Sequence, residues 1–112
     1  MNQGDIYLAH FPFTDGTSAK LRPVLVISSN RFNGSEDVVV LPISSKPKGS
    51  DPFAIFIDEL SSDFNETGLK TSSSIKWTKP MTISKSVIRR YLGHLSTILL
   101  ENTLAQMQNL LN

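Results

Sequence analysis

The chain contains no cysteine, which excludes disulfide bridges, thiolate nucleophiles and cysteine-based zinc sites. It also has no apolar run near the roughly 20 residues that a membrane-spanning helix needs, and its first residues lack the basic and apolar regions of a signal peptide. We therefore expect a cytoplasmic protein without a membrane partner. The formal net charge is only +1, so bulk charge neither requires nor excludes a nucleic-acid partner.

A chain of 112 residues can bury a core of its own, so we expect a single domain over residues 1–112. Runs rich in Val, Ile, Leu, Tyr and Phe alternate with Gly, Pro, Asn and Ser, which is typical of short strands separated by turns. The predicted strands are residues 5–11, 21–28, 37–43, 53–57 and 74–78. In the last of these, Ser74, Lys76 and Thr78 are predicted to form an exposed polar face, and Ile75 and Trp77 a buried one.

The C-terminal part of the chain predicts one helix. Ser96 is suited to cap its first turn. The apolar residues after Ser96 recur at helical spacing and form one stripe: Ile98, Leu99, Leu100, Leu104, Met107, Leu110 and Leu111. Residues 84–88 are compatible with a helical turn and residues 88–94 with a strand. Several strands followed by one helix predict an α+β fold, either a strongly bent antiparallel sheet or a small SH3-like barrel, closed by the C-terminal helix.

Two apolar runs each carry a polar residue of chemical use. Arg22 lies at the start of the second predicted strand and Ser44 at the end of the third. If these strands pair antiparallel, the start of one lies beside the end of the other, so a guanidinium and a hydroxyl converge at one edge of the sheet. Such a pair is suited to binding phosphate. By itself, Arg22 is also compatible with a surface ion pair to Asp5 or Asp37, and Ser44 with a simple turn residue.

Five ordered segments resemble the PemK/MazF family of toxins from bacterial toxin–antitoxin modules. They are Gly4-Asp5-Ile6-Tyr7, the strand from Arg22-Pro23 to Ser28, Pro42-Ile43-Ser44-Ser45, Gly68-Leu69 through Ile75, and Gly93-His94-Leu95-Ser96. The resemblance implies the fold that those toxins share with the gyrase-directed CcdB toxins, and a homodimer. It also implies growth inhibition through sequence-specific cleavage of single-stranded RNA without a metal or cofactor, and a cognate antitoxin that blocks the site.

The resemblance places the family's catalytic arginine at Arg22 and its catalytic hydroxyl, commonly a threonine, at Ser44. Cleavage without a metal uses the ribose 2′-hydroxyl as nucleophile and leaves a cyclic phosphate and a free 5′-hydroxyl. Arg22 is suited to stabilising the phosphorane oxygens, and it is too basic to accept a proton readily. Serine lacks the branch that stiffens threonine, so the hydroxyl of Ser44 is less preorganised. We expect His10 and His94 to be surface or structural residues. Without an imidazole at the site, we expect the enzyme to be slow.

Contacts to RNA are expected from loops and from one polar strand face near the same edge. The candidates are Phe13, Thr14, Lys20, Arg31, Ser45, Lys46 and Lys76. Phe13 lies in the polar loop that the resemblance places over the site, so it is a better stacking surface for a base than Trp77.

Two functions of other classes remain open at this point. One is a noncatalytic inhibitor that clamps a protein target, as the CcdB toxins do. The other is a small RNA-binding barrel without cleavage. Retention of both Arg22 and Ser44 favours the nuclease, because a binding module does not need that pair.

Overall fold

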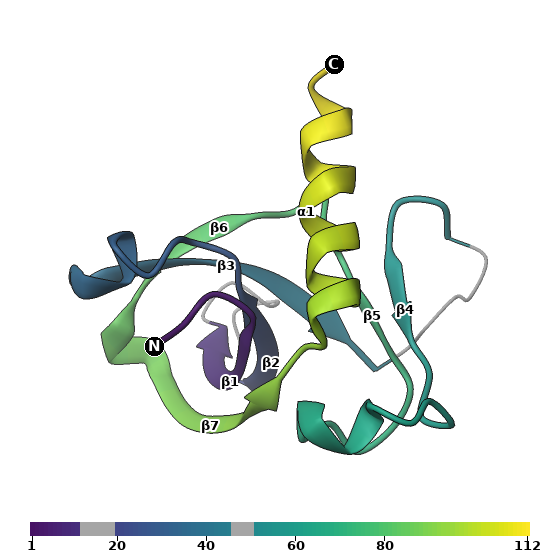
Figure 1. Cartoon of the computed structure of the whole chain (residues 1–112). Coiled ribbons are helices and arrows are strands. Elements are labelled where there is room, and N and C mark those ends of the chain that lie inside the picture. Colours follow the sequence, from purple (N-terminus) through teal and green to yellow (C-terminus); the bar gives the residue numbers. More distant parts are fainter. Residues whose placement is uncertain (12–19, 46–50) are drawn as a thin grey trace.

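The computed structural model describes residues 1–11, 20–45 and 51–112 (Figure 1). Its strands are β1 (Asp5–Phe11), β2 (Lys20–Val26), β3 (Asp37–Ser44), β4 (Ile55–Ile57), β5 (Ser73–Ile75), β6 (Met81–Ser84) and β7 (Ile88–His94). Three short 3₁₀ helices, η1 (Phe32–Gly34), η2 (Phe64–Thr67) and η3 (Lys85–Val87), lie in the connections. One α-helix, α1 (Thr97–Leu110), follows the strands.

The seven strands form one sheet in the order β4-β5-β3-β2-β1-β7, and β6 pairs with the first half of β3. Every pairing is antiparallel. The sheet bends strongly, so that β7, β1, β2, β3 and β6 curl around one end of the molecule (Figure 1). Within the described residues β6 and β7 do not pair, so the fold is the bent antiparallel sheet and not the closed barrel.

The bend gives the molecule two hydrophobic cores, one on each face of the sheet. The first core lies under α1 and is built around Leu25, Leu41 and Ile75, with Leu99 and Leu100 of the helix packed against it. The second core consists mainly of small residues, among them Ala9, Val24 and Val40, inside the curl of the strands. Because successive strand residues point to opposite faces, Val24 and Leu25 belong to different cores.

Helix α1 begins as the sequence predicts. The hydroxyl of Ser96 accepts a hydrogen bond from the backbone N–H of Leu99 at 3.3 Å, which caps the first turn. The prediction of one continuous buried stripe is wrong at both ends, because Ile98 and Leu111 are 79% and 87% exposed. The C-terminal end of α1 rises away from the sheet, so its last apolar residues have no strand beneath them in the described chain (Figure 1).

Several predicted strand boundaries also differ from the structure. The second strand ends at Val26 and not at residue 28, and the fourth begins at Ile55 and not at residue 53. The fifth covers Ser73–Ile75, and the short strand β6 was not predicted. Residues 84–94 contain both elements that the sequence allows, η3 followed by β7. No helix in the described part of the chain has the length and apolar character needed to cross a membrane.

Two glycines fix the segment after η2 against β7. Gly68 has a φ of +71°, in the left-handed region that favours glycine. A Cβ atom at Gly93 would lie 2.1 Å from the carbonyl oxygen of Glu66. The backbone of η2 therefore packs directly on β7, and the residues that follow Gly68 run along the side of the sheet.

Candidate functional site

The pairing of β2 with β3 puts the two predicted catalytic residues at the same end of the hairpin. The paired residues are Val24 with Pro42, Leu25 with Leu41, and Val26 with Val40. Continuing this register by two residues sets Arg22 opposite Ser44. Both residues then share the face of Val24 and Val40, because side chains alternate along each strand. The side chains therefore lie on one face of the sheet and not on opposite faces.

The ladder between β2 and β3 ends just before this pair. Pro23 and Pro42 have no backbone N–H to contribute at this end of the hairpin. The last residues of β3 pair on their other side with β5, Ile43 with Ile75 and Ser44 with Ser74. The start of β2 is paired only with β1 in the described part of the chain. Within the described residues, this end of the hairpin is therefore an open edge, with no backbone pairing between Arg22 and Ser44.

The guanidinium of Arg22 has no ion-pair partner among the described residues. Its Nε is buried and makes no hydrogen bond there. Arg22 lies opposite Ala9 of β1, whose methyl group offers no polar partner. Asp5 is at the far end of β1, and Asp37 is at the far end of β3, so the ion pairs considered from the sequence do not form. A buried donor without a partner is available to an acceptor such as a phosphate oxygen.

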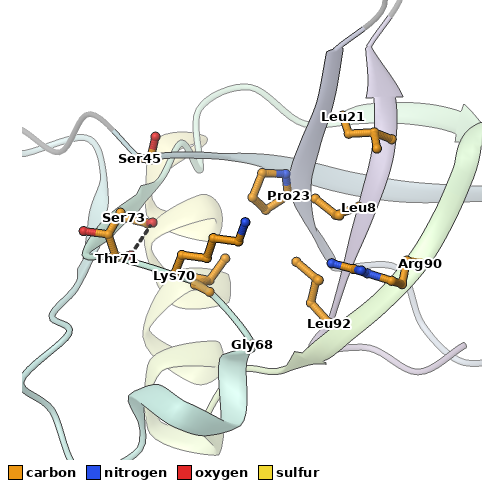
Figure 2. Close-up of a pocket in the computed structure, with 11 residues that line it drawn as sticks. Leu8, Leu21, Pro23, Ser45, Gly68, Lys70, Thr71, Ser73, Arg90 and Leu92 are labelled. Atoms are coloured by element: carbon orange, nitrogen blue, oxygen red, sulfur yellow. Dashed lines mark hydrogen bonds between the residues drawn. The ribbon is translucent and has the colours of Figure 1, made fainter.

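A cleft of about 350 Å³ lies beside this edge, on the other face of β2 (Figure 2). Leu8, Leu21 and Pro23 form one wall, and Ser45 lies across from them. Neither Arg22 nor Ser44 lines the cleft, but their chain neighbours do. Arg22 and Ser44 therefore lie at the rim of this cleft.

Two cationic side chains reach the cleft from opposite sides, Lys70 after η2 and Arg90 on β7 (Figure 2). Neither forms an ion pair within the described residues. Neither residue was predicted from the sequence. A single lysine in a connection gives no signal, and Arg90 reaches the cleft only because β7 pairs with β1, Leu8 opposite Arg90.

The other predicted RNA contacts divide into three groups. Lys20 is exposed at the start of β2 and Ser45 lines the cleft, so both lie near Arg22 and Ser44. Lys76 is also close, since its N–H donates to the carbonyl of Pro42 at 3.0 Å, but its Nζ pairs with Asp51 at 3.5 Å.

Arg31 lies in the connection at the opposite end of β2, so the expectation that it sits near this edge is wrong. The hairpin separates it from Arg22 by the length of the strand. Phe13, Thr14 and Lys46 lie outside the described residues.

The predicted polar face is buried at Ser74, partly buried at Lys76 and exposed at Thr78. Strand β5 lies between β3 and β4, and Ser73, Ser74 and Ile75 are all buried. The prediction of alternating exposure is wrong at Ser74 and confirmed from Ile75 to Thr78. The alternation of a sequence does not show what packs over each face of a strand. Trp77 is 4% exposed and belongs to the first core, as expected for a tryptophan that alternates with Ile75.

The two histidines do not face Arg22. His10 of β1 pairs with Leu21 of β2. Because side chains alternate along a strand, the imidazole of His10 lies on the face opposite Arg22. His94 lies at the end of β7, where its Nε2 is 3.7 Å from a carboxylate oxygen of Glu66. Among the residues that the structure describes, no group of three or more His, Asp or Glu side chains is placed to hold a metal ion.

Comparison with known proteins gives the family. The model of the PemK-like, MazF-like toxins of type II toxin–antitoxin systems matches residues 2–111. The chain belongs to this toxin family. A curated relative of this MazF-like toxin, the probable endoribonuclease MazF of Mycolicibacterium smegmatis, is 31% identical over 96 residues, which are 86% of this chain and 83% of the relative.

Solved structures share the fold of this toxin. The Mycobacterium tuberculosis toxin MazF-mt6 superposes with a TM-score of 0.73 at 20% identity, over 94% of this chain and 93% of its own. MazF in a MazE–MazF crystal structure from Deinococcus radiodurans superposes with a TM-score of 0.75 at 19% identity, over 99% and 94% of the two chains. The bent sheet with its C-terminal helix is thus the MazF-like toxin fold.

Proposed function

We propose that this MazF-like toxin, an endoribonuclease, cleaves single-stranded RNA at short sequences without a metal, using Arg22 and Ser44. The observation that carries the proposal is their placement on one face at an open sheet edge, where the buried Nε of Arg22 has no partner within the described residues. The family and the curated relative named as an endoribonuclease support the same reaction class.

In the proposed reaction the ribose 2′-oxygen attacks the adjacent phosphorus and the bond to the 5′-oxygen of the next nucleotide breaks. A cyclic phosphate and a 5′-hydroxyl result. The 2′-hydroxyl loses its proton, and the leaving oxygen gains one. Arg22 stabilises the charge that builds on the phosphorane oxygens, because its planar fork donates two hydrogen bonds in fixed geometry. Ser44 donates to the same oxygens or helps to protonate the leaving group.

This arrangement implies a slow enzyme. A guanidinium remains protonated at neutral pH and is a poor general base. Without an imidazole, the reaction forgoes part of the roughly 100- to 10,000-fold acceleration that general acid–base catalysis supplies. We therefore expect kcat to change little between pH 6 and 8, and a titration step that disappears in His10→Gln would contradict this assignment.

The RNA lies along the open edge in this proposal, with flanking phosphates near the cations Lys70 and Arg90, which form no ion pair within the described chain. Lys20 and Ser45 border the same edge. Phe13, Thr14, Lys46 and Lys76 remain predicted contacts on the sequence argument alone.

We further propose a cytoplasmic homodimer that a cognate antitoxin inhibits. Toxin–antitoxin complexes among the similar structures support that partner, and an acidic segment would suit these cations.

The test is incubation of the purified toxin with a long single-stranded RNA in EDTA, followed by analysis of the fragment ends. We expect discrete fragments with cyclic phosphate and 5′-hydroxyl ends. Arg22→Ala should reduce the rate by about 1,000-fold, because it removes the donors to the phosphorane. Its melting temperature should remain that of the unmodified chain, since the guanidinium makes no ion pair within the described residues.

Other results would favour other functions. RNA that is retarded but intact would indicate a binding barrel, and no effect on RNA would favour a protein-directed inhibitor of the CcdB type. Cleavage that stops in EDTA and returns with a divalent cation would overturn the metal-independent mechanism while keeping the nuclease.

A further inference from the structure

We propose that Ser74 is a positioning residue for Ser44: when a phosphodiester is bound, the hydroxyl of Ser74 donates a hydrogen bond to Ser44 Oγ. This inference rests on the proposed function, because it concerns the hydroxyl that the proposal sets at the cleavage site. It adds a third residue to the pair that the sequence singles out.

Sheet pairing sets the two serines directly opposite each other. Ser44 of β3 pairs with Ser74 of β5, next to the pair Ile43 and Ile75. Both isoleucines belong to the core under α1, so alternation turns both serines to the other face, which is also the face of Arg22. Cβ atoms of directly opposed residues lie roughly 4.5–5.5 Å apart, within which two hydroxyl groups can reach hydrogen-bond distance.

The hydroxyl of Ser74 lacks a partner where one is expected. Ser74 is 1% exposed, and its Oγ makes no hydrogen bond within the described residues. Its neighbour Ser73 is 3% exposed, yet its hydroxyl donates to the carbonyl of Thr71 at 2.9 Å (Figure 2). Buried polar groups are normally satisfied, and an exception calls for a specific reason. A donor held ready beside Ser44 is such a reason.

The chemistry of two adjacent hydroxyls gives this donor a use. A serine has one proton to donate and two lone pairs to accept with. If Ser74 donates to Ser44 Oγ, the one proton of Ser44 is directed away from Ser74 and toward the phosphate. A hydrogen bond accepted by Ser44 also polarises its own O–H and strengthens the bond that it donates. Hydrogen bonds of this kind often tighten only when substrate is bound.

Because residue 44 is a serine, a hydrogen bond from Ser74 can help to orient its hydroxyl. Threonine has a branched Cβ that restricts χ1, whereas serine rotates more freely. A contact from a neighbouring strand therefore helps to hold the hydroxyl of Ser44 in one direction, and Ser74 is the residue that the sheet sets opposite it.

The test is the variant Ser74→Ala, measured by RNA cleavage in EDTA with kcat and KM separated. We expect kcat to fall about 3- to 10-fold, the size of one hydrogen bond, while KM stays the same. The melting temperature should stay the same or rise, because the variant removes a buried hydroxyl without a partner in the described chain. A merely structural role would instead lower melting temperature and activity together.

Making Ser74→Ala in the Ser44→Thr variant as well as in the unmodified chain separates a positioning role from other effects. In Ser44→Thr the branched side chain orients its own hydroxyl, so adding Ser74→Ala should cost less than about twofold in kcat. The control is Thr103→Val, which removes a fully buried hydroxyl on α1 that donates to the carbonyl of Leu99 at 2.8 Å. It should lower the melting temperature and leave kcat unchanged.

Two results would overturn the proposal: an unchanged kcat in Ser74→Ala, or an equal loss of kcat whether Ser74→Ala is made in the unmodified chain or in the Ser44→Thr variant. Arg22→Ala distinguishes this failure from that of the proposed function. If Arg22→Ala is inactive while Ser74→Ala behaves as the unmodified toxin, only the role of Ser74 is lost. If Arg22→Ala remains active, the whole site assignment is lost.

Discussion

The two ends of the β2–β3 hairpin differ in how their polar groups are satisfied. At the connected end, Asn33 is 4% exposed and is held on several sides. Its amide nitrogen donates to the carbonyl of Ser28 at 3.0 Å, and its side-chain oxygen accepts from the hydroxyl of Ser28. The same hydroxyl accepts from the N–H of Val39 at 3.0 Å, and the Lys85 ammonium donates to the carbonyl of Asn33. This network closes the hairpin.

Beside the open end, two donors have no hydrogen-bond partner within the described part of the chain, one on β2 and one on the adjacent strand β5. The Nε of Arg22 and the Oγ of Ser74 are buried and make no hydrogen bond within the described part of the chain. Arg22 belongs to the same hairpin as the connected end, so local strand propensity does not cause the difference. The connected end stabilises the fold, whereas the open end keeps donors available, which is the pattern expected of a site that binds an anion.

The largest effect in this comparison is expected from Arg22→Lys at the open end. Lysine keeps the positive charge, but it loses the planar fork and the Nε donor. We expect kcat for RNA cleavage to fall about 100-fold, the typical cost of removing one preorganised donor. The urea midpoint should remain unchanged. A rate within about threefold of the unmodified toxin would mean that charge alone suffices.

A smaller effect, on stability only, is expected from Asn33→Ala at the connected end. The variant leaves the carbonyl and the hydroxyl of Ser28 without their partner. We expect the free energy of unfolding to fall by about 2 kcal/mol, because buried groups lose their hydrogen bonds. Urea denaturation measures this loss, and kcat below the transition should not change. A drop in kcat without a loss of stability would contradict the division between the two ends.

The hairpin itself was predictable from the sequence, and its pairing puts Arg22 and Ser44 at the same end of the two strands. Two apolar runs joined by a short polar connection pair antiparallel, and their register then follows from local geometry. The N-cap at Ser96 was equally local. Two of the five segments that resemble the toxin family, Arg22 to Ser28 and Pro42 to Ser45, lie in or next to this hairpin, and a third ends at Ser96.

The missed features depend on contacts between distant segments. The polar pattern around Ser74 predicts exposure, but Ser74 is 1% exposed in the folded chain. Arg90 reaches the cleft only through the pairing of β7 with β1. Leu111 continues the helical spacing, yet the sheet ends before it. Periodicity in a sequence shows which residues share a face of an element, but not what lies against that face.

The smallest expected effect concerns Tyr7, which packs against the second core. Burial, assisted by the nearby carboxylate of Asp5 and by Tyr91, raises the pKa of Tyr7 above its ordinary value of 10.0. The folded chain therefore holds the phenol proton more tightly than the unfolded chain does. This contribution to stability is complete below pH 10 and is lost as the pH rises through the folded-state pKa.

Tyr7→Phe removes this titration, and it also removes the hydroxyl that donates to Asp5 at 3.5 Å, a long hydrogen bond. At pH 8 we expect a change in the free energy of unfolding of less than about 1 kcal/mol. Between pH 9 and 11 the urea midpoint of the variant should fall less steeply than that of the unmodified chain. Parallel curves would show that Tyr7 ionises equally in both states. Tyr7 pairs with Val24 and not with Arg22, and its side chain is not part of the proposed site, so kcat at pH 7 should not change. Variants of Arg22, by contrast, should lower kcat.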